Sequence, residues 1–347
     1  MITSTAQPPA TTASMAEEDS ATSFSSLQTD IIEAHILPRL DGITLAATSC
    51  CSNTLRQISS QDHLWSKTCH STWPSTRSPR VCQIISTYPD GGPSKFFSQA
   101  FPLLEEDDHS CSNVRPSSPS APPPSELISA VDIHYQDKLI FSKVQETETV
   151  TGWFRCSPFR IDLLEPKDVV PTPIKHPEGD ETCTSIFNSM TLSWILIDPI
   201  GRQAVNLSSH KPVTVQRHWL TGEVQMRFAS ILAVDSGHVQ CGIVVTCSVS
   251  EEGDMMQIRE ICLEIEDMDG MHINGTGCLG ILQRAMEGKK GKGRNRVQEG
   301  QRRYKEYLEM KKEIQDRKAR TEGTLDTLCM ALGVSCFLAF WCFILFR

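Results

Sequence analysis

A proline- and serine-rich segment at residues 105–125 divides this chain into two parts with different hydrophobic patterns. The segment starts with four acidic residues in a row and continues with five prolines among serines. Because proline fixes φ and lacks a backbone N–H, a run of this composition propagates neither a helix nor a strand. We therefore expect residues 105–125 to form an acidic, Pro/Ser-rich linker.

Before this linker, apolar residues recur at the spacing of α-helices. The Asp41-Gly42 pair interrupts them with a turn, and Asp is a favoured N-cap for the helix that follows. The pattern predicts two or three short helices between residues 27 and 67. Residues 1–23 lack aromatic side chains and periodicity, so we expect a disordered tail there. The helical spacing is carried by Ile31, Ile32, Ile36, Leu37, Leu40, Leu45, Ala46, Leu55 and Ile58.

Beyond the linker, short runs rich in Val, Ile, Thr, Phe and Trp alternate with Gly, Pro and Asp. Such runs at short intervals are typical of the strands of an antiparallel β-sandwich. We predict one β-rich, sandwich-like domain over residues 126–283 and an α+β multidomain chain overall. The predicted strands cover residues 127–134, 138–144, 152–155, 192–198, 213–216, 223–234, 238–249 and 257–266.

The end of the chain contains an apolar run at residues 328–346, which is 19 residues long and carries no charge. A helix rises about 1.5 Å per residue, so this run comes close to the roughly 30 Å thickness of the hydrocarbon core of a bilayer. We predict a single transmembrane helix that anchors the protein by its tail. The alternative is a helix buried in a soluble core, which would need a protein groove around its aromatic side chains.

Basic residues precede the apolar run. Between Arg284 and Arg320 there are 14 Lys and Arg against six Asp and Glu, in a chain whose net charge is −9. We divide this region into a basic linker at 284–300 and a charged amphipathic helix at 301–322, which could lie along lipid or pair as a coiled coil. The basic excess favours the cytosolic face of a membrane. Since it lacks interleaved aromatic residues, we expect no nucleic-acid partner.

Several short elements carry a resemblance to a known family. They are Ile36-Leu37-Pro38-Arg39-Leu40-Asp41, Thr44-Leu45-Ala46, Leu64-Trp65, Leu127 to Asp132, Ser193 to Pro199 and Trp219 to Gly222. With them, residues 27–275 resemble a subfamily of plant F-box proteins. The resemblance implies a three-helix F-box at residues 24–70, followed by an extension at 71–104. It also implies that the F-box binds an SKP-type adaptor, and through it a cullin, in an SCF-type ubiquitin ligase.

Specific contacts follow from this resemblance. The residues expected at or just behind the adaptor interface are Leu27, Ile31, Ile36, Leu37, Leu40, Leu45 and Trp65. The alternative is that they are core positions of an ordinary helical bundle. In the family the remainder of the chain selects a protein substrate, and no catalytic residue is implied, so we expect a non-enzymatic receptor subunit whose substrate is unknown.

The β-rich domain also admits a second interpretation. A lectin-like or small-ligand-binding sandwich would present exposed aromatic side chains that stack on a sugar or another ring, and Trp153, Trp194 and Trp219 are the candidates. Equally, all three could belong to the core. An enzyme remains a third possibility, but no nucleophile, base and orienting group occur together in the sequence.

Motifs for cofactors and metals are incomplete. Gly275-Thr-Gly277-Cys-Leu-Gly280 has the glycine spacing of a dinucleotide-binding turn, but no second strand or acidic residue follows at the required distance. His63, Cys69 and His70 cluster without a further cysteine pair at zinc-ligand spacing. We therefore expect no cofactor and no metal. The 14 cysteines are irregularly spaced in a chain without a visible signal peptide, which favours reduced thiols.

Overall fold

The structure is a computed structural model, and it describes residues 28–89, 91–101, 122–176, 180–234, 237–250, 253, 255–288, 290–291 and 295–347. The tail expected at residues 1–23, Leu27 and most of the linker expected at 105–125 lie outside the described residues. The chain divides into two compact units, of which the first ends at Ser59 and the second begins at Ser60. This boundary falls inside the range 24–70 that the sequence assigns to one helical module.

The first unit consists of short helical segments, as expected. The carboxylate of Asp41 accepts a hydrogen bond from the backbone N–H of Thr44 at 2.8 Å, so the N-cap that the sequence predicts is present. Pro38 occupies the first turn of its segment, where the missing N–H costs no hydrogen bond. The segments are α1 (Thr29–Ile31), η2 (Ile32–Ile36), η3 (Leu37–Arg39), α2 (Gly42–Thr48) and α3 (Asn53–Ser59).

The second unit begins with a layer of helices held together by aromatic rings. The ring of Phe97 lies 5.3 Å from that of Trp65 and 5.2 Å from that of Trp73, measured between centroids. Trp65 and Trp73 are both buried, so these rings form the centre of the layer. The helical layer comprises α4 (Asp62–Thr72), η4 (Pro74–Arg77), α5 (Pro79–Ser86) and α6 (Gly92–Ala100).

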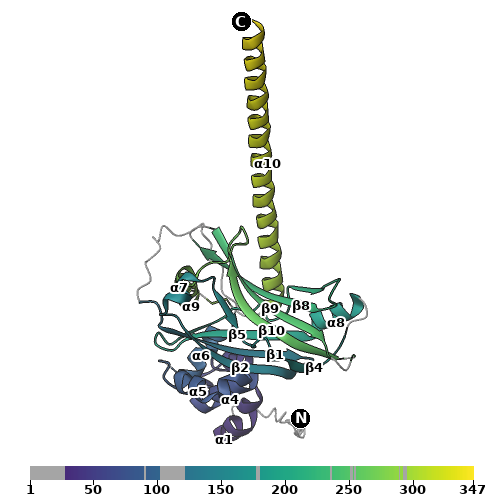
Figure 1. Cartoon of the computed structure of the whole chain (residues 1–347). Helices are drawn as coiled ribbons and strands as arrows, with labels where there is room; N and C mark the ends of the chain where they lie inside the picture. The colour runs from purple at the N-terminus through teal and green to yellow at the C-terminus, as the bar shows by residue number, and fades with distance from the viewer. Residues whose placement is uncertain are drawn as a thin grey trace, which may run out of the picture. The chain divides into compact units, whose positions relative to one another are not determined.

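Two antiparallel sheets follow, and they confirm the prediction of a β-rich domain (Figure 1). The first sheet has the order β2-β1-β5-β6, formed by β1 (Glu126–Tyr135), β2 (Lys138–Glu148), β5 (Met190–Asp198) and β6 (Gln203–Asn206). The second has the order β3-β10-β9-β8-β7, with β4 also paired to β10. Its strands are β3 (Arg160–Asp162), β4 (Val170–Lys175), β7 (Thr214–Arg217), β8 (Val224–Val234), β9 (Gly237–Val249) and β10 (Met255–Glu266).

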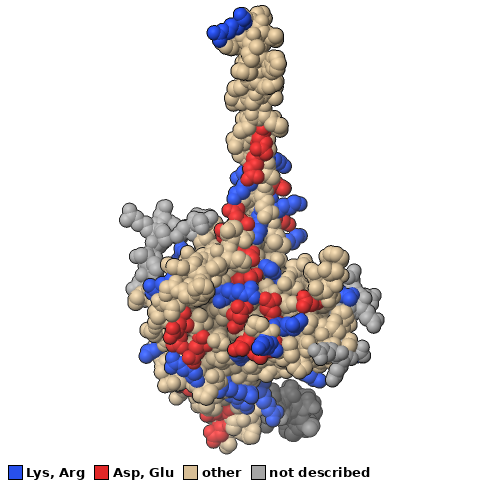
Figure 2. Space-filling view, viewed as in Figure 1, with Lys and Arg blue, Asp and Glu red and all other residues tan. Residues whose placement is uncertain are grey.

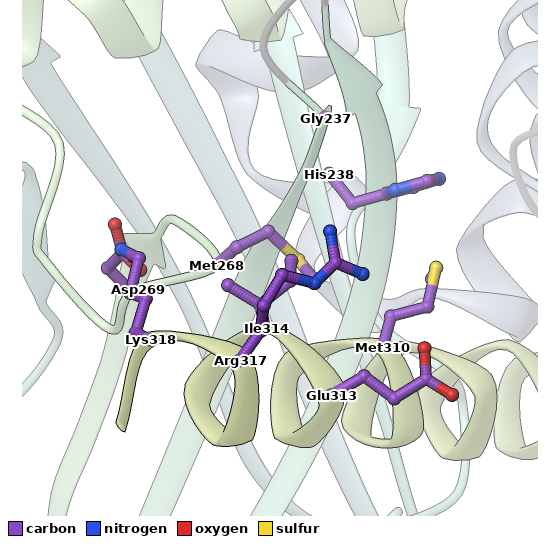
Figure 3. Close-up of a pocket in the computed structure, with 9 residues that line it drawn as sticks. All are labelled: Gly237, His238, Met268, Asp269, Met310, Glu313, Ile314, Arg317 and Lys318. Carbon is purple, nitrogen blue, oxygen red and sulfur yellow. The ribbon is translucent and has the colours of Figure 1, made fainter. Parts of the chain in front are cut away.

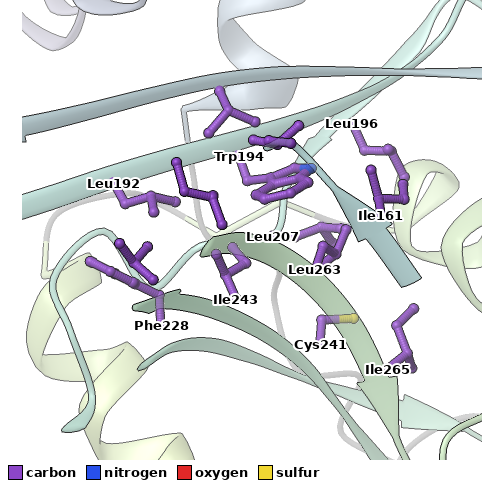
Figure 4. Close-up of a cluster of buried hydrophobic side chains, with 14 of the residues drawn as sticks. Ile161, Leu192, Trp194, Leu196, Leu207, Phe228, Cys241, Ile243, Leu263 and Ile265 are labelled. Carbon is purple, nitrogen blue, oxygen red and sulfur yellow. The ribbon is translucent and has the colours of Figure 1, made fainter. Parts of the chain in front are cut away.

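One hydrophobic core lies between the two sheets (Figure 4). Alternate residues of β5 point into it, because side chains of a strand alternate between its faces. Leu192, Trp194 and Leu196 meet Phe228 of β8 and Ile243 of β9 in this core. The two sheets therefore pack as the predicted sandwich.

The outer face of the first sheet is covered by the helical layer. The indole N–H of Trp73 donates to the hydroxyl of Ser193 in β5 at 3.2 Å. The carboxylate of Asp132 in β1 accepts hydrogen bonds from the backbone N–H and the hydroxyl of Ser75, at 2.9 and 2.6 Å. Residues 71–104 are thus part of the sandwich unit, whereas the sequence places them with the preceding helices, because the Pro/Ser-rich segment separates them from β1 along the chain.

Among the residues that the structure describes, four further helices belong to the second unit. α7 (Gly152–Cys156) replaces a strand predicted at 152–155, because Thr151 caps it by accepting from the N–H of Phe154 at 3.2 Å. The others are α8 (Asp180–Ser189), α9 (Gly275–Glu287) and α10 (Arg296–Leu345). α10 is one continuous helix of 50 residues, and it joins the predicted charged helix and the predicted transmembrane helix.

Candidate partner-binding surfaces

The residues predicted to bind an adaptor differ in how far they are exposed. Leu37 and Leu45 are buried in the structure, and Trp65 is buried in the helical layer of the second unit. Ile36 and Leu40 are half-buried, and Leu27 lies outside the described residues. Ile31 is exposed over 42% of its surface. Buried side chains hold the helices, so a partner would contact the exposed ones.

Sequence reasoning misses one candidate in the first unit. Ile43 in α2 is exposed over 53% of its surface, although it is a large β-branched hydrophobe. It is the second residue after the Asp41 cap, and it therefore lies in the first turn of α2, two positions before the buried Leu45. Because positions two apart on a helix point to different faces, a helix that buries Leu45 leaves Ile43 exposed.

The three tryptophans considered as ligand-stacking residues do not form one site. Trp194 is fully buried, and its indole N–H donates to the hydroxyl of Ser129 at 3.1 Å. Its ring is therefore a core element and is not available to a ligand. Trp153 in α7 is exposed over 84% of its surface, and Trp219, in the turn between β7 and β8, over 88%. The alternative that all three tryptophans are core residues is therefore wrong for Trp153 and Trp219.

The turn that carries Trp219 is well ordered by hydrogen bonds. The N–H of Gly222 donates to the carbonyl of His218 at 2.9 Å, and the N–H of Thr221 donates to Nδ1 of His218 at 3.2 Å. Gly222 has φ +71°, a conformation that glycine adopts without strain. The His218 ring stacks beside that of Trp219, with 6.4 Å between centroids. The indole is thus held outward by its backbone.

The glycine motif at Gly275 has a packing function. A Cβ on Gly275 would collide with the carbonyl oxygen of Phe154 in α7, so only glycine allows the two helices this approach. Asn274 caps α9 by accepting from the N–H of Gly277 at 2.9 Å. The N-terminus of α9 is therefore capped by its own chain and packed against α7.

The His and Cys residues that resemble a zinc motif have other partners. The thiol of Cys69 contacts the carbonyl of Pro93 at 3.6 Å, and burial raises its pKa to about 12. Nδ1 of His70 lies 2.9 Å from the hydroxyl of Thr76. A metal would need a thiolate and a free ring nitrogen at this place, so these residues are structural.

A second group has metal-ligand chemistry but is already balanced by basic side chains. Glu264, Glu266 and His272 place their ligand atoms within 4.8 Å of one another. Glu264 lies 3.6 Å from Arg160 and 3.8 Å from Arg227, and Glu266 lies 3.9 Å from Lys311 of α10. Because these cations neutralise the carboxylates, the group is an ion-pair network that ties α10 to the second sheet.

α10 contacts the sandwich along its first half. The guanidinium of Arg296 lies 4.5 Å above the Phe101 ring and donates to the carbonyl of Phe101 at 3.3 Å. Tyr307 is fully buried, and its hydroxyl donates to the carbonyl of Asp267 at 3.1 Å. Lys318 pairs with Asp269 at 2.5 Å. Of the residues predicted as a basic linker at 284–300, residues 284–287 form the end of α9 and residues 296–300 the start of α10.

The remainder of α10 extends away from the sheets (Figure 1). Its large apolar side chains are exposed; Phe337, Phe340 and Phe343 each expose more than 60% of their surface. Charged side chains gather on the part of α10 near the sandwich, and the outer part is uncharged as far as Arg347 (Figure 2). Among the described residues, α10 is the one helix long and apolar enough to cross a membrane.

These features define, in the part of the chain described, a sandwich protein with a separate unit of short N-terminal helices and a long apolar C-terminal helix. A probable F-box protein of Arabidopsis thaliana is 45% identical over 93% of this chain and 94% of its own length. Two further F-box proteins of that plant are 40% and 42% identical, over 94% and 93% of this chain and 97% and 91% of their own lengths. The chain belongs to this family of plant F-box proteins.

No family model matches the chain. No solved structure matches it either.

Proposed function

We propose that this protein is the non-catalytic substrate receptor of an SCF-type cullin-RING ubiquitin ligase, with the F-box at residues 24–70 as its docking element for an SKP-type adaptor. The observation that carries the proposal is the identity of at least 40% to F-box proteins over more than 90% of the chain. The sandwich with its helical layer would then recruit the protein target.

The exposed isoleucines of the first unit support an adaptor contact. Apolar side chains that remain exposed on a small helical module are suited to fill pockets of a partner, since such a module cannot bury a large core by itself. Among the described residues of the first unit, Ile31 and Ile43 are the large hydrophobes that expose more than 40% of their surface. They are therefore better targets for mutation than Leu45, whose replacement by a charge would unfold α2.

Co-purification of the adaptor tests this proposal. We expect Ile43→Asp to weaken adaptor binding at least tenfold, because it places an unpaired charge in an apolar contact. Leu139→Asp is the matched control, since Leu139 is exposed over 45% of its surface on β2 of the other unit. If Ile43→Asp and Leu139→Asp recover as much adaptor and cullin as the natural chain, the proposed role of this surface is wrong.

We also propose that α10 anchors the protein in a membrane, with the sandwich on the cytosolic face. The uncharged run at residues 328–346 supports the span, and the basic residues before it support the orientation. A chain that ends at Thr324 keeps the domain contacts from Arg296 to Lys318. We expect it to be soluble and to bind adaptor, whereas the full chain should resist alkaline carbonate extraction. Equal extraction of the two chains would rule out the anchor.

Exposed Trp219 favours a second candidate function, the binding of a glycan or another ring-bearing ligand by the sandwich. The ordered turn holds the indole outward, with the His218 ring stacked beside it, and such rings stack on sugars. A glycan array with the chain that ends at Thr324 tests this function. Binding that disappears in Trp219→Ala and persists in Trp153→Ala would support it, and the absence of binding would contradict it.

A further inference from the structure

A hollow of about 460 Å³ lies where α10 leaves the sandwich. One wall is α10 itself, and the other walls are the start of β9 and the turn after β10 (Figure 3). Its surface is mixed, with the apolar side chains of Met268, Met310 and Ile314, and with charged groups at Glu313 and Arg317. Methionine side chains are flexible and polarisable, so they suit a surface that accepts a peptide.

Some of the charged side chains around this hollow form ion pairs with each other, and others do not. Asp269 and Lys318 also line it, but they pair with each other at 2.5 Å. Figure 3 shows the side chain of Arg317 rising from α10 toward Met268 and His238. The guanidinium of Arg317 has no hydrogen-bond or ion-pair partner among the residues that the structure describes. A polypeptide with an acidic residue beside an apolar one would match Arg317 and the neighbouring methionines.

The proposed membrane span, which begins at Leu328, sets the height of this hollow above the membrane. Between Ile314 and Leu328 the helix is continuous, and 14 residues at 1.5 Å each correspond to about 20 Å. The headgroup layer accounts for only about 5–8 Å of this, and a tilt of about 40° still leaves about 16 Å. Lipid headgroups therefore do not reach the hollow, whereas the cytosolic segment of a neighbouring membrane protein does.

The same face of α10 continues into the apolar run. Ala331 and Ser335 follow Glu313 and Arg317 by 18 residues each, which is five full helical turns. Small residues allow transmembrane helices to approach closely. A second membrane helix lying on this face would therefore continue, outside the bilayer, along the wall of the hollow.

We propose that this hollow docks a juxtamembrane cytosolic segment of another integral membrane protein, so that the receptor selects substrates within its own membrane. The inference rests on the proposed ligase function and on the proposed anchor. The bound segment is amphipathic, and it lies about 20 Å from the hydrocarbon. An extended chain covers this distance in about 6 residues, at about 3.3 Å each, and a helix in about 14.

Photocrosslinking in the full-length chain tests the proposal in plant-cell membranes. Benzoylphenylalanine in place of Met310 reports on the hollow, and the same group in place of Leu308 is the control. Leu308 is exposed over 42% of its surface. It lies two residues before Met310, so the two side chains point about 160° apart around the axis of the helix. We expect adducts at position 310, at least tenfold above position 308, with integral membrane proteins, attached about 6–14 residues from their apolar spans.

An insertion in α10 tests whether the distance of the hollow from the membrane matters, because it changes this distance and leaves the residues of the hollow unchanged. Eighteen helix-forming residues after Thr321 keep the face of α10, because they add five turns, and they raise the hollow by about 27 Å. The contacts of α10 with the sandwich described above, as far as Lys318, precede this point, so we expect the fold to be unchanged. We expect the insertion to abolish the juxtamembrane adducts while adaptor binding and carbonate resistance persist.

Other results would overturn the inference. These are adducts with lipid, with soluble proteins or with a second copy of the chain, equal labelling at positions 308 and 310, labelling that survives the insertion, or no adduct from a chain that resists carbonate extraction and binds adaptor. In all these cases the proposed ligase function stands, because adaptor binding is measured in the same membranes. Loss of carbonate resistance or of adaptor binding in the natural chain would instead contradict the proposed function.

Discussion

Replacement of Asp132 by alanine should detach the helical layer from the sandwich. Asp132 is fully buried, and its carboxylate accepts from the N–H of Ser75 at 2.9 Å, the hydroxyl of Ser75 at 2.6 Å and the hydroxyl of Ser142 at 2.7 Å. The two hydroxyls can rotate toward other acceptors, but the buried N–H cannot. An unsatisfied buried group costs about 1–3 kcal/mol.

The expected net loss is about 2–4 kcal/mol of unfolding free energy, since the lost hydrogen bonds are partly offset by removal of a buried charge. Urea denaturation of the chain that ends at Thr324, followed by circular dichroism, measures it. Asp168→Ala is the control, because Asp168 is exposed and its side chain makes no hydrogen bond or ion pair with any residue that the structure describes; it should change stability by less than about 0.5 kcal/mol.

A double-mutant cycle makes the reasoning refutable. If Asp132 acts through Ser75, the effects of Asp132→Ala and Ser75→Ala should not add, and their coupling should reach about 1 kcal/mol or more. Additive effects, or a loss in Asp132→Ala no larger than in Asp168→Ala, would show that this buried carboxylate does not hold the helical layer.

Two further predictions concern other contacts of the sandwich unit. Gly275→Ala should destabilise the chain by more than about 2 kcal/mol in the same urea assay, because its Cβ meets the carbonyl of Phe154, whereas Gly280→Ala, which meets no atom within 4 Å, should be neutral or stabilising. Burial, aided by Arg296, lowers the pKa of His210 from 6.5 to about 3. Since the folded pKa lies below the unfolded one, stability is complete above pH 6.5 and falls as the pH is lowered toward 3, by roughly 2–3 kcal/mol at pH 4.5. His210→Gln should flatten this decline, and an unchanged pH profile would contradict the assignment.

Local interactions determined what could be predicted correctly. The Asp41 cap depends on residues three positions apart, and the sequence alone shows it. The strand predicted at 192–198 is present as β5, and the alternation of its side chains puts Leu192 and Leu196 on one face. The helix at 328–346 was predicted from the apolar composition of that run. The failure at residues 152–155 has the same origin, because the aromatic residues Trp153 and Phe154 suggested a strand while a Thr151 cap started a helix.

Long-range packing decided the remaining features. Trp73 and Ser193 are 120 residues apart in the chain, and their hydrogen bond joins the helical layer to the sheet across a segment that sequence reasoning treated as a division. Composition does not distinguish Trp194, which is buried between the sheets, from Trp219, which is exposed on a turn, since their burial depends on which surfaces fold over them. The hollow beside α10 likewise combines residues from β9, the turn after β10 and α10. The sequence alone therefore determined the local elements and the family resemblance, and the tertiary structure decided which of their faces remain open to a partner, because exposure is set by contacts between segments distant in the chain.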